Sequence, residues 1–145
     1  MDLLKLPPQV KHMGEPLVID IYTYKAQLSP SLRHPTGVVD GDTIQVDVDK
    51  GMRDWKRGAR MRLYAINAAE MRGSERPLGL SAKSHLTSLL ETCPGFPHCE
   101  LVVKTHQDKK TFDRYVAEIW TRDGEACLNL VMVIDGFAEW DLENL

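Results

Sequence analysis

Two stretches of the chain alternate between apolar and polar residues, as half-buried β-strands do. Their apolar positions are Ile44, Val46 and Val48 in the first, and Met61, Leu63 and Ala65 in the second. Because successive side chains of a strand point to opposite faces, each pattern predicts a strand with one face in the core. Runs rich in β-branched and aromatic residues predict three more strands, at residues 17–26, 101–103 and 115–119. A polar turn is expected at residues 106–110.

Two other stretches repeat apolar residues at helical spacing. Residues 79–92 predict an amphipathic helix that Pro94-Gly95 ends. Residues 127–134 predict a second helix, with Gly136 as its C′ residue, although its β-branched residues leave a strand as the alternative. Five strands and two helices in this order predict an α+β protein dominated by a small five-stranded barrel. Residues 1–16 are expected to form a loosely docked N-terminal arm, and residues 17–145 the domain.

Composition narrows the class of protein. The chain has 145 residues, a net charge of −3 and 43% hydrophobic residues, which fits one folded domain with a core. The near-neutral charge argues against a protein held to nucleic acid by a global basic field. Without an apolar run of about 18 residues or a signal peptide, and with three cysteines, we expect a cytoplasmic protein that does not enter a membrane. A monomer is expected.

Two short motifs bring oxygen ligands towards one rim of the barrel. Asp40-Gly41-Asp42 is a turn signal just before the first alternating strand, and Asn67 follows the second. If the two strands are antiparallel neighbours, these ends lie close together. Carboxylate, amide and backbone carbonyl oxygens are the ligands of hard cations such as Ca²⁺. Each motif alone is more often a simple turn or strand end, so the prediction depends on their meeting.

Charged residues near these motifs suit phosphate chemistry. Arg62 lies in the second alternating strand and Arg114 precedes the strand at 115–119. A guanidinium can direct two N–H groups onto phosphate oxygens. Glu70 follows Asn67 closely, and a carboxylate beside a bound water can take its proton. A cation, two arginines and a base would together form a phosphoryl-transfer site. Singly, each residue is an ordinary surface charge.

The order of these motifs resembles the staphylococcal nuclease (thermonuclease) family. The resemblance spans about residues 17–140 and rests on Val39–Thr43, Arg62–Glu70, Phe112–Tyr115, Asn129 and Asp135–Ala138. It implies an OB-fold barrel with packed helices. It also implies a Ca²⁺-dependent nuclease that hydrolyses the phosphodiester bonds of DNA, RNA or both. Compact nucleases of this kind resemble those of bacteria and phages.

The resemblance assigns roles residue by residue. The implied Ca²⁺ ligands are Asp42, Asn67 and the backbone carbonyl of Ala68. The implied catalytic residues are Arg62 and Arg114, which contact the phosphate and the transition state, and Glu70, which is the base. Gly79 matches a family glycine, without an evident chemical role.

Three departures from the family pattern are expected to weaken activity, and one of them, Asn67, favours an alternative function. Asn67 stands where the family has an aspartate, and the loss of one negative charge is expected to weaken metal binding. Ala68-Ala69 replaces Thr-Pro, which removes the rigidity of proline from the turn. Asp113 replaces a glycine, so an acid beside Arg114 would compete with phosphate. The alternative is an OB-fold nucleic-acid-binding module that is non-catalytic or weakly active.

A basic stretch lies between the two alternating strands and runs into the second. Six of the thirteen residues from position 50 to 62 are basic, and Trp55 lies among them. Basic side chains beside an aromatic ring suit nucleic acid, through phosphate attraction and base stacking. An exposed charged hairpin explains the same pattern equally well.

Overall fold

Five strands close a barrel in this computed structural model, which describes residues 5–107, 115–143 and 145. The barrel strands are β1 (Thr23–Leu28), β3 (Thr43–Asp49), β4 (Trp55–Leu63), β6 (Glu100–His106) and β7 (Tyr115–Thr121). They pair in the order β1-β6-β7-β4-β3, and β3 pairs back with β1. The β4–β7 pair is parallel, whereas the other pairs are antiparallel. The α+β, barrel-dominated, OB-like fold is therefore confirmed.

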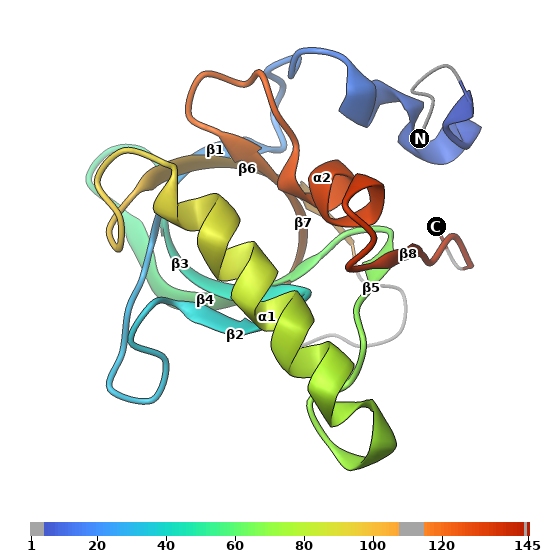
Figure 1. The fold of residues 1–145 in the computed structure, drawn as a ribbon. Coiled ribbons are helices and arrows are strands. Elements are labelled where there is room, and N and C mark those ends of the chain that lie inside the picture. The colour runs from blue at the N-terminus through green and yellow to red at the C-terminus, as the bar shows by residue number, and fades with distance from the viewer. Residues whose placement is uncertain (1–4, 108–114, 144) are drawn as a thin grey trace.

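Short strands and two α-helices complete the fold (Figure 1). Strand β2 (Val38–Asp40) extends the sheet beside β3, and β5 (Ile66–Asn67) pairs with β8 (Glu139–Trp140). Helix α1 (Arg76–Glu91) runs across one side of the barrel against β2, and α2 (Leu128–Ile134) packs against β7. The helix predicted for the second apolar stripe is confirmed, and Gly136 takes the positive φ of a C′ residue, 82°.

The alternating patterns place the core as predicted. Ile44, Val46 and Val48 are buried inside the barrel, as are Met61 and Leu63 on β4. Strands β3 and β4 are antiparallel neighbours, with Thr43 opposite Arg62. This register puts the start of β3 and the end of β4 at the same rim of the barrel. The second strand stops earlier than predicted, because Ala65 takes a φ of 67° in a turn.

Two strand boundaries differ from the sequence prediction. The first strand begins at Thr23 rather than Leu17, because Asp20 forms a local turn in which its carboxylate accepts from the Tyr22 N–H at 2.8 Å. Strand β4 begins at Trp55, inside the stretch expected to be a loop. Its early part pairs with β3 up to Asp49. Strand ends depend on partners distant in sequence, which local patterns do not show.

The described part of the N-terminal arm, residues 5–16, packs against the domain and is not loosely docked. It forms the 3₁₀-helix η2 (Pro8–Gly14), whose Val10 and Met13 are buried in a second apolar cluster with Trp120 and Leu130. His12 Nε2 donates to the Glu118 carboxylate at 2.8 Å. Figure 1 shows this segment beside α2. In the described ranges, no helix combines the length and apolar character needed to cross a bilayer.

Candidate functional site

The turn at the start of β3 and the turn after β4 meet through Asp42. The Asp42 carboxylate accepts a hydrogen bond from the backbone N–H of Ala68 at 3.0 Å, and the Asp42 carbonyl accepts from Leu63 N–H at 2.7 Å. Gly41 allows this approach, because a Cβ at position 41 would lie 2.6 Å from the Ala82 Cβ on α1 and 2.9 Å from the Ala68 Cβ. The expected convergence of the two motifs is therefore present.

Arg62 lies between the two side-chain oxygens that the sequence assigns to a cation. Its Nη2 donates to Asn67 Oδ1 at 3.2 Å and lies 3.8 Å from Asp42 Oδ2. The Arg62 side chain is 24% exposed, and the Asp42 side chain 13%. The guanidinium thus supplies positive charge to the oxygen cluster. A cation bound by Asp42 and Asn67 would have to displace Arg62 or lie beside it. A displaced guanidinium would be free to contact a phosphate.

Favourable contacts do not fully offset the cost of burying the Asp42 carboxylate in its charged form. Burial, together with a hydrogen bond and charge repulsion from Asp40, raises the pKa of Asp42 to about 6, although the Ala68 N–H and Arg62 act in the opposite direction. Because the folded pKa lies above the unfolded value of 3.8, this group favours folding below pH 3.8. That contribution is lost as the pH rises through 6. Perturbed carboxylates of this kind gather at functional sites.

The donor set fits a hard divalent cation. Asp42, Asp40 and Asn67 offer side-chain oxygens, and Ca²⁺ fills its remaining positions with carbonyls and water. Asp40 was not assigned a role from the sequence, although the Asp-Gly-Asp motif contains the signal. The described residues contain no group of three or more His, Cys, Asp or Glu side chains arranged to hold a metal. Any cation here would therefore rely on amide, backbone and water oxygens beyond two carboxylates.

Glu70 is separated from this cluster. Its side chain is 64% exposed, and its carboxylate lies 3.7 Å from Arg72 Nε. Within the described part of the chain, it makes no hydrogen bond or ion pair with Asp42, Arg62 or Asn67. The structure therefore brings Asp42, Arg62, Asn67 and the backbone N–H of Ala68 together but leaves the expected base facing solvent on the same turn.

Gly79 holds the backbone of the Glu70 turn. Gly79 is buried in the first turns of α1, and a Cβ there would overlap the carbonyl oxygen of Glu70 and lie 2.9 Å from Met71 Cα. Only glycine lets the helix approach the turn this closely. The residue whose role was not evident from the sequence is thus a spacer between α1 and the segment that carries Glu70.

We expect Gly79→Ala to lower the free energy of unfolding by about 1–3 kcal/mol, because the added methyl group displaces the Glu70 backbone. This loss of stability is expected although helix propensity by itself favours alanine over glycine by about 1 kcal/mol. Urea unfolding measures it. Ser84→Ala is the matched control, because Ser84 is exposed on the same helix, and no loss is expected there. A Gly79→Ala protein as stable as the wild type would contradict the spacer role.

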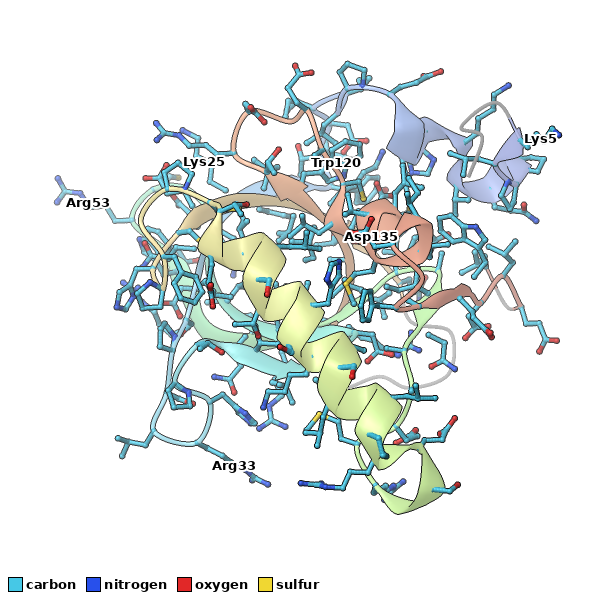
Figure 2. All side chains as sticks on the ribbon, viewed as in Figure 1. Lys5, Lys25, Arg33, Arg53, Trp120 and Asp135 are labelled. Atoms are coloured by element: carbon cyan, nitrogen blue, oxygen red, sulfur yellow. The ribbon has the colours of Figure 1, made fainter. Side chains whose placement is uncertain are left out.

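The remaining sequence predictions divide into two groups. Arg114, with Asp113 and Phe112, lies outside the described residues. In the basic stretch, Arg57 pairs with Asp47 at 3.3 Å and covers the Trp55 ring at 4.7 Å from its centroid. Trp55 therefore has one face occupied by an arginine, which favours the interpretation of this part of the stretch as a charged hairpin. Figure 2 shows Arg53 at the periphery, pointing away from the barrel.

A cleft of about 310 Å³ opens beside residues 67–69. Its apolar lining includes Leu78, Phe137 and Ala138, and its polar lining includes Glu75 and Glu139. Two carboxylates disfavour a polyanion on this side of the Asn67 turn. The nearby arginines, Arg60 and Arg62, belong to β4 and do not line this cleft.

Neither the models of known protein families nor the curated proteins compared with this sequence match it. Its function is therefore inferred from its own residues and their geometry.

Proposed function

We propose that this protein is a Ca²⁺-dependent nuclease that hydrolyses phosphodiester bonds of DNA, RNA or both. The observation that carries the proposal is the contact of one guanidinium, Arg62, with the oxygens of Asp42 and Asn67 at a barrel rim. This is a compact group of anionic and cationic side chains, and it is the combination that binding both a cation and a phosphate requires.

Each residue of the site has a distinct part in the proposed reaction. Asp42, Asn67, Asp40 and the Ala68 carbonyl would hold Ca²⁺, which would supply positive charge next to the phosphate. Arg62 binds a non-bridging phosphate oxygen and stabilises the charge that develops during attack. Glu70 accepts a proton from the attacking water. Arg114 is proposed as the second phosphate contact, on the sequence alone.

A second candidate function is a nucleic-acid-binding module with weak or no catalysis. Two observations favour it: the exposed Glu70 carboxylate lies near Arg72, and Asn67 supplies a neutral oxygen where a second carboxylate would bind a cation more tightly. In this module Arg62 would bind phosphate without a cation.

Incubation of the purified protein with single-stranded DNA and with RNA, in Ca²⁺ and in chelator, tests the proposal. We expect cleavage that Ca²⁺ supports and chelator abolishes. Binding without cleavage at any Ca²⁺ concentration would support the binding module. Equal cleavage with Ca²⁺ and with chelator would exclude the proposed role of the cation.

Asn67→Asp is expected to tighten Ca²⁺ binding about ten-fold, because a second carboxylate adds about 1 kcal/mol or more of attraction at this exposed position. Isothermal titration calorimetry with Ca²⁺ measures the affinity, and the cleavage assay shows whether activity rises with it. Gln9→Glu is the control, because it adds the same charge on the exposed side of the N-terminal arm. An unchanged affinity in Asn67→Asp would remove residue 67 from the proposed cation site.

A further inference from the structure

Three cationic side chains come from segments that adjoin the β2–β3 hairpin, which carries Asp42. Arg33 lies on the loop of residues 29–37, Arg60 on β4 and Lys83 on α1. Figure 2 shows Arg33 at the lower end of the molecule, below β2 in that view. None of the three takes part in the proposed Ca²⁺ site or in the phosphate contact of Arg62.

Backbone hydrogen bonds tie the loop that carries Arg33 to β3, the strand that pairs with β4 and Arg60. Gln45 holds both ends of the loop of residues 29–37. Its N–H donates to the Gly37 carbonyl at 2.7 Å, and its carbonyl accepts from Ser29 N–H at 2.9 Å. Arg60 is the cross-strand partner of Gln45. The loop that carries Arg33 therefore starts and ends one strand away from Arg60, across β3.

Packing of α1 adds Lys83 to the same region. Ala82 lies against Gly41, so Lys83 belongs to the turn of α1 that packs on residues 40–42. The pKa of His34 reflects the electrostatic field that results. Burial lowers the pKa of His34, and Arg60, Lys83 and Arg33 lower it further, whereas Asp40 opposes them. The Nδ1 atom of His34 is buried without a hydrogen-bond partner in the described residues.

The three cations have no acidic partner among the described residues. The ion pairs among the described residues involve other basic side chains, including Lys50, Arg57, Arg62 and Arg72. Converging like charges raise the local positive potential, and a bound anion would relieve their repulsion. Arginine and lysine are the side chains that proteins use to bind phosphate.

We propose that Arg33, Arg60 and Lys83 form a second phosphate-binding subsite, which holds a backbone phosphate of a single-stranded nucleic acid next to the phosphate at Arg62. Arg60 and Arg62 are two residues apart, so they share one face of β4, with about 7 Å between their Cα atoms. The location of the first phosphate rests on the proposed function, but binding at the second subsite does not require cleavage.

The test is fluorescence anisotropy with a labelled single-stranded oligodeoxythymidine, in chelator, over a series of salt concentrations. The variant combines Arg33→Gln, Arg60→Gln and Lys83→Gln. We expect its affinity at low salt to fall about ten-fold or more. We also expect the slope of log affinity against log salt to become shallower by about 0.7 for each phosphate that the variant no longer neutralises.

A charge-matched control combines Lys5→Gln, Lys25→Gln and Arg53→Gln. These three residues are exposed and lie far from Arg33 in Figure 2. The affinity of this control variant for the oligonucleotide is expected to change by less than about two-fold. Equal losses in both triple variants would show only a general effect of net charge and would overturn the subsite, as would unchanged binding in the first variant.

The two proposals fail in different ways. If the wild-type protein binds the oligonucleotide, loses affinity in the Arg33, Arg60 and Lys83 variant, and cleaves nothing in Ca²⁺, the subsite stands and the nuclease proposal fails. If it cleaves in Ca²⁺ but binds equally well in both triple variants, the subsite is wrong and the nuclease proposal stands.

Discussion

Replacing Glu118 by alanine is expected to lower the free energy of unfolding by about 3–5 kcal/mol, the usual cost of removing one partner of a buried ionic group. Glu118 is fully buried and accepts three hydrogen bonds: from His12 at 2.8 Å, from His106 at 2.6 Å and from Trp120 Nε1 at 3.1 Å. Alanine would leave the buried Trp120 Nε1 without an acceptor, and the partly exposed His12 and His106 would keep only water as a partner. Urea unfolding at neutral pH measures the loss.

The electrostatics of Glu118 give this prediction a pH dependence. Burial by itself raises the pKa of Glu118, but the hydrogen bonds and charges of His106 and His12 outweigh it and lower the pKa to about 2. Because the folded pKa lies below the unfolded value of 4.5, the ionised carboxylate stabilises the fold above pH 4.5. The difference between wild type and variant is therefore expected to shrink as the pH falls from 4.5 towards 2.

Glu125→Ala is the matched control, because Glu125 is exposed on the turn after β7. Its effect should stay within about 0.5 kcal/mol. Limited proteolysis of the N-terminal arm adds a local readout, since His12 ties η2 to Glu118. If Glu118→Ala cost no more than the control, the buried cluster would contribute nothing to stability.

This cluster also shows what sequence patterns miss. The sequence predicts a strand at residues 115–119 but gives no sign that Glu118 is buried. In the structure β7 is buried on both faces from Val116 to Trp120, because the N-terminal arm and α2 cover the outer face. His106 was expected in a polar turn, yet it ends β6 and stacks on Tyr64 at 3.6 Å between ring centroids. Both features depend on segments far apart in sequence.

The candidate site was more predictable, because its elements follow local rules. Alternation fixed the inward faces of β3 and β4, and the antiparallel pairing of neighbouring strands then brought Asp42 and Asn67 to one rim. The contact of Arg62 with both oxygens did not follow from strand patterns, since it depends on side-chain direction in a turn. The closeness of Gly79 to Glu70 was equally hidden, because a glycine in a helix gives no sign of what approaches it.

Under the proposed function, Glu70→Gln is expected to lower kcat about 10²- to 10⁴-fold, the usual contribution of a general base. The change keeps the size of the side chain and removes its ability to accept a proton. The exposed Glu70 carboxylate lies 3.7 Å from Arg72, so it must turn away from Arg72 to reach a water near Asp42 and Arg62. Binding of the oligonucleotide in chelator should be unchanged, because Glu70 contacts no phosphate in this scheme.

Two further variants separate the role of Glu70 as a base from two other effects: the loss of one negative charge, and the loss of the ion pair between Glu70 and Arg72. Glu91→Gln removes the same charge at the far, exposed end of α1 and should leave kcat unaltered. Arg72→Ala frees the Glu70 carboxylate, so kcat should hold or rise if that pair restrains the base. Full cleavage by Glu70→Gln, still abolished by chelator, would reject Glu70 as the base while retaining the Ca²⁺-dependent nuclease. Loss of oligonucleotide binding in Glu70→Gln would instead show that the turn after Asn67 positions the substrate.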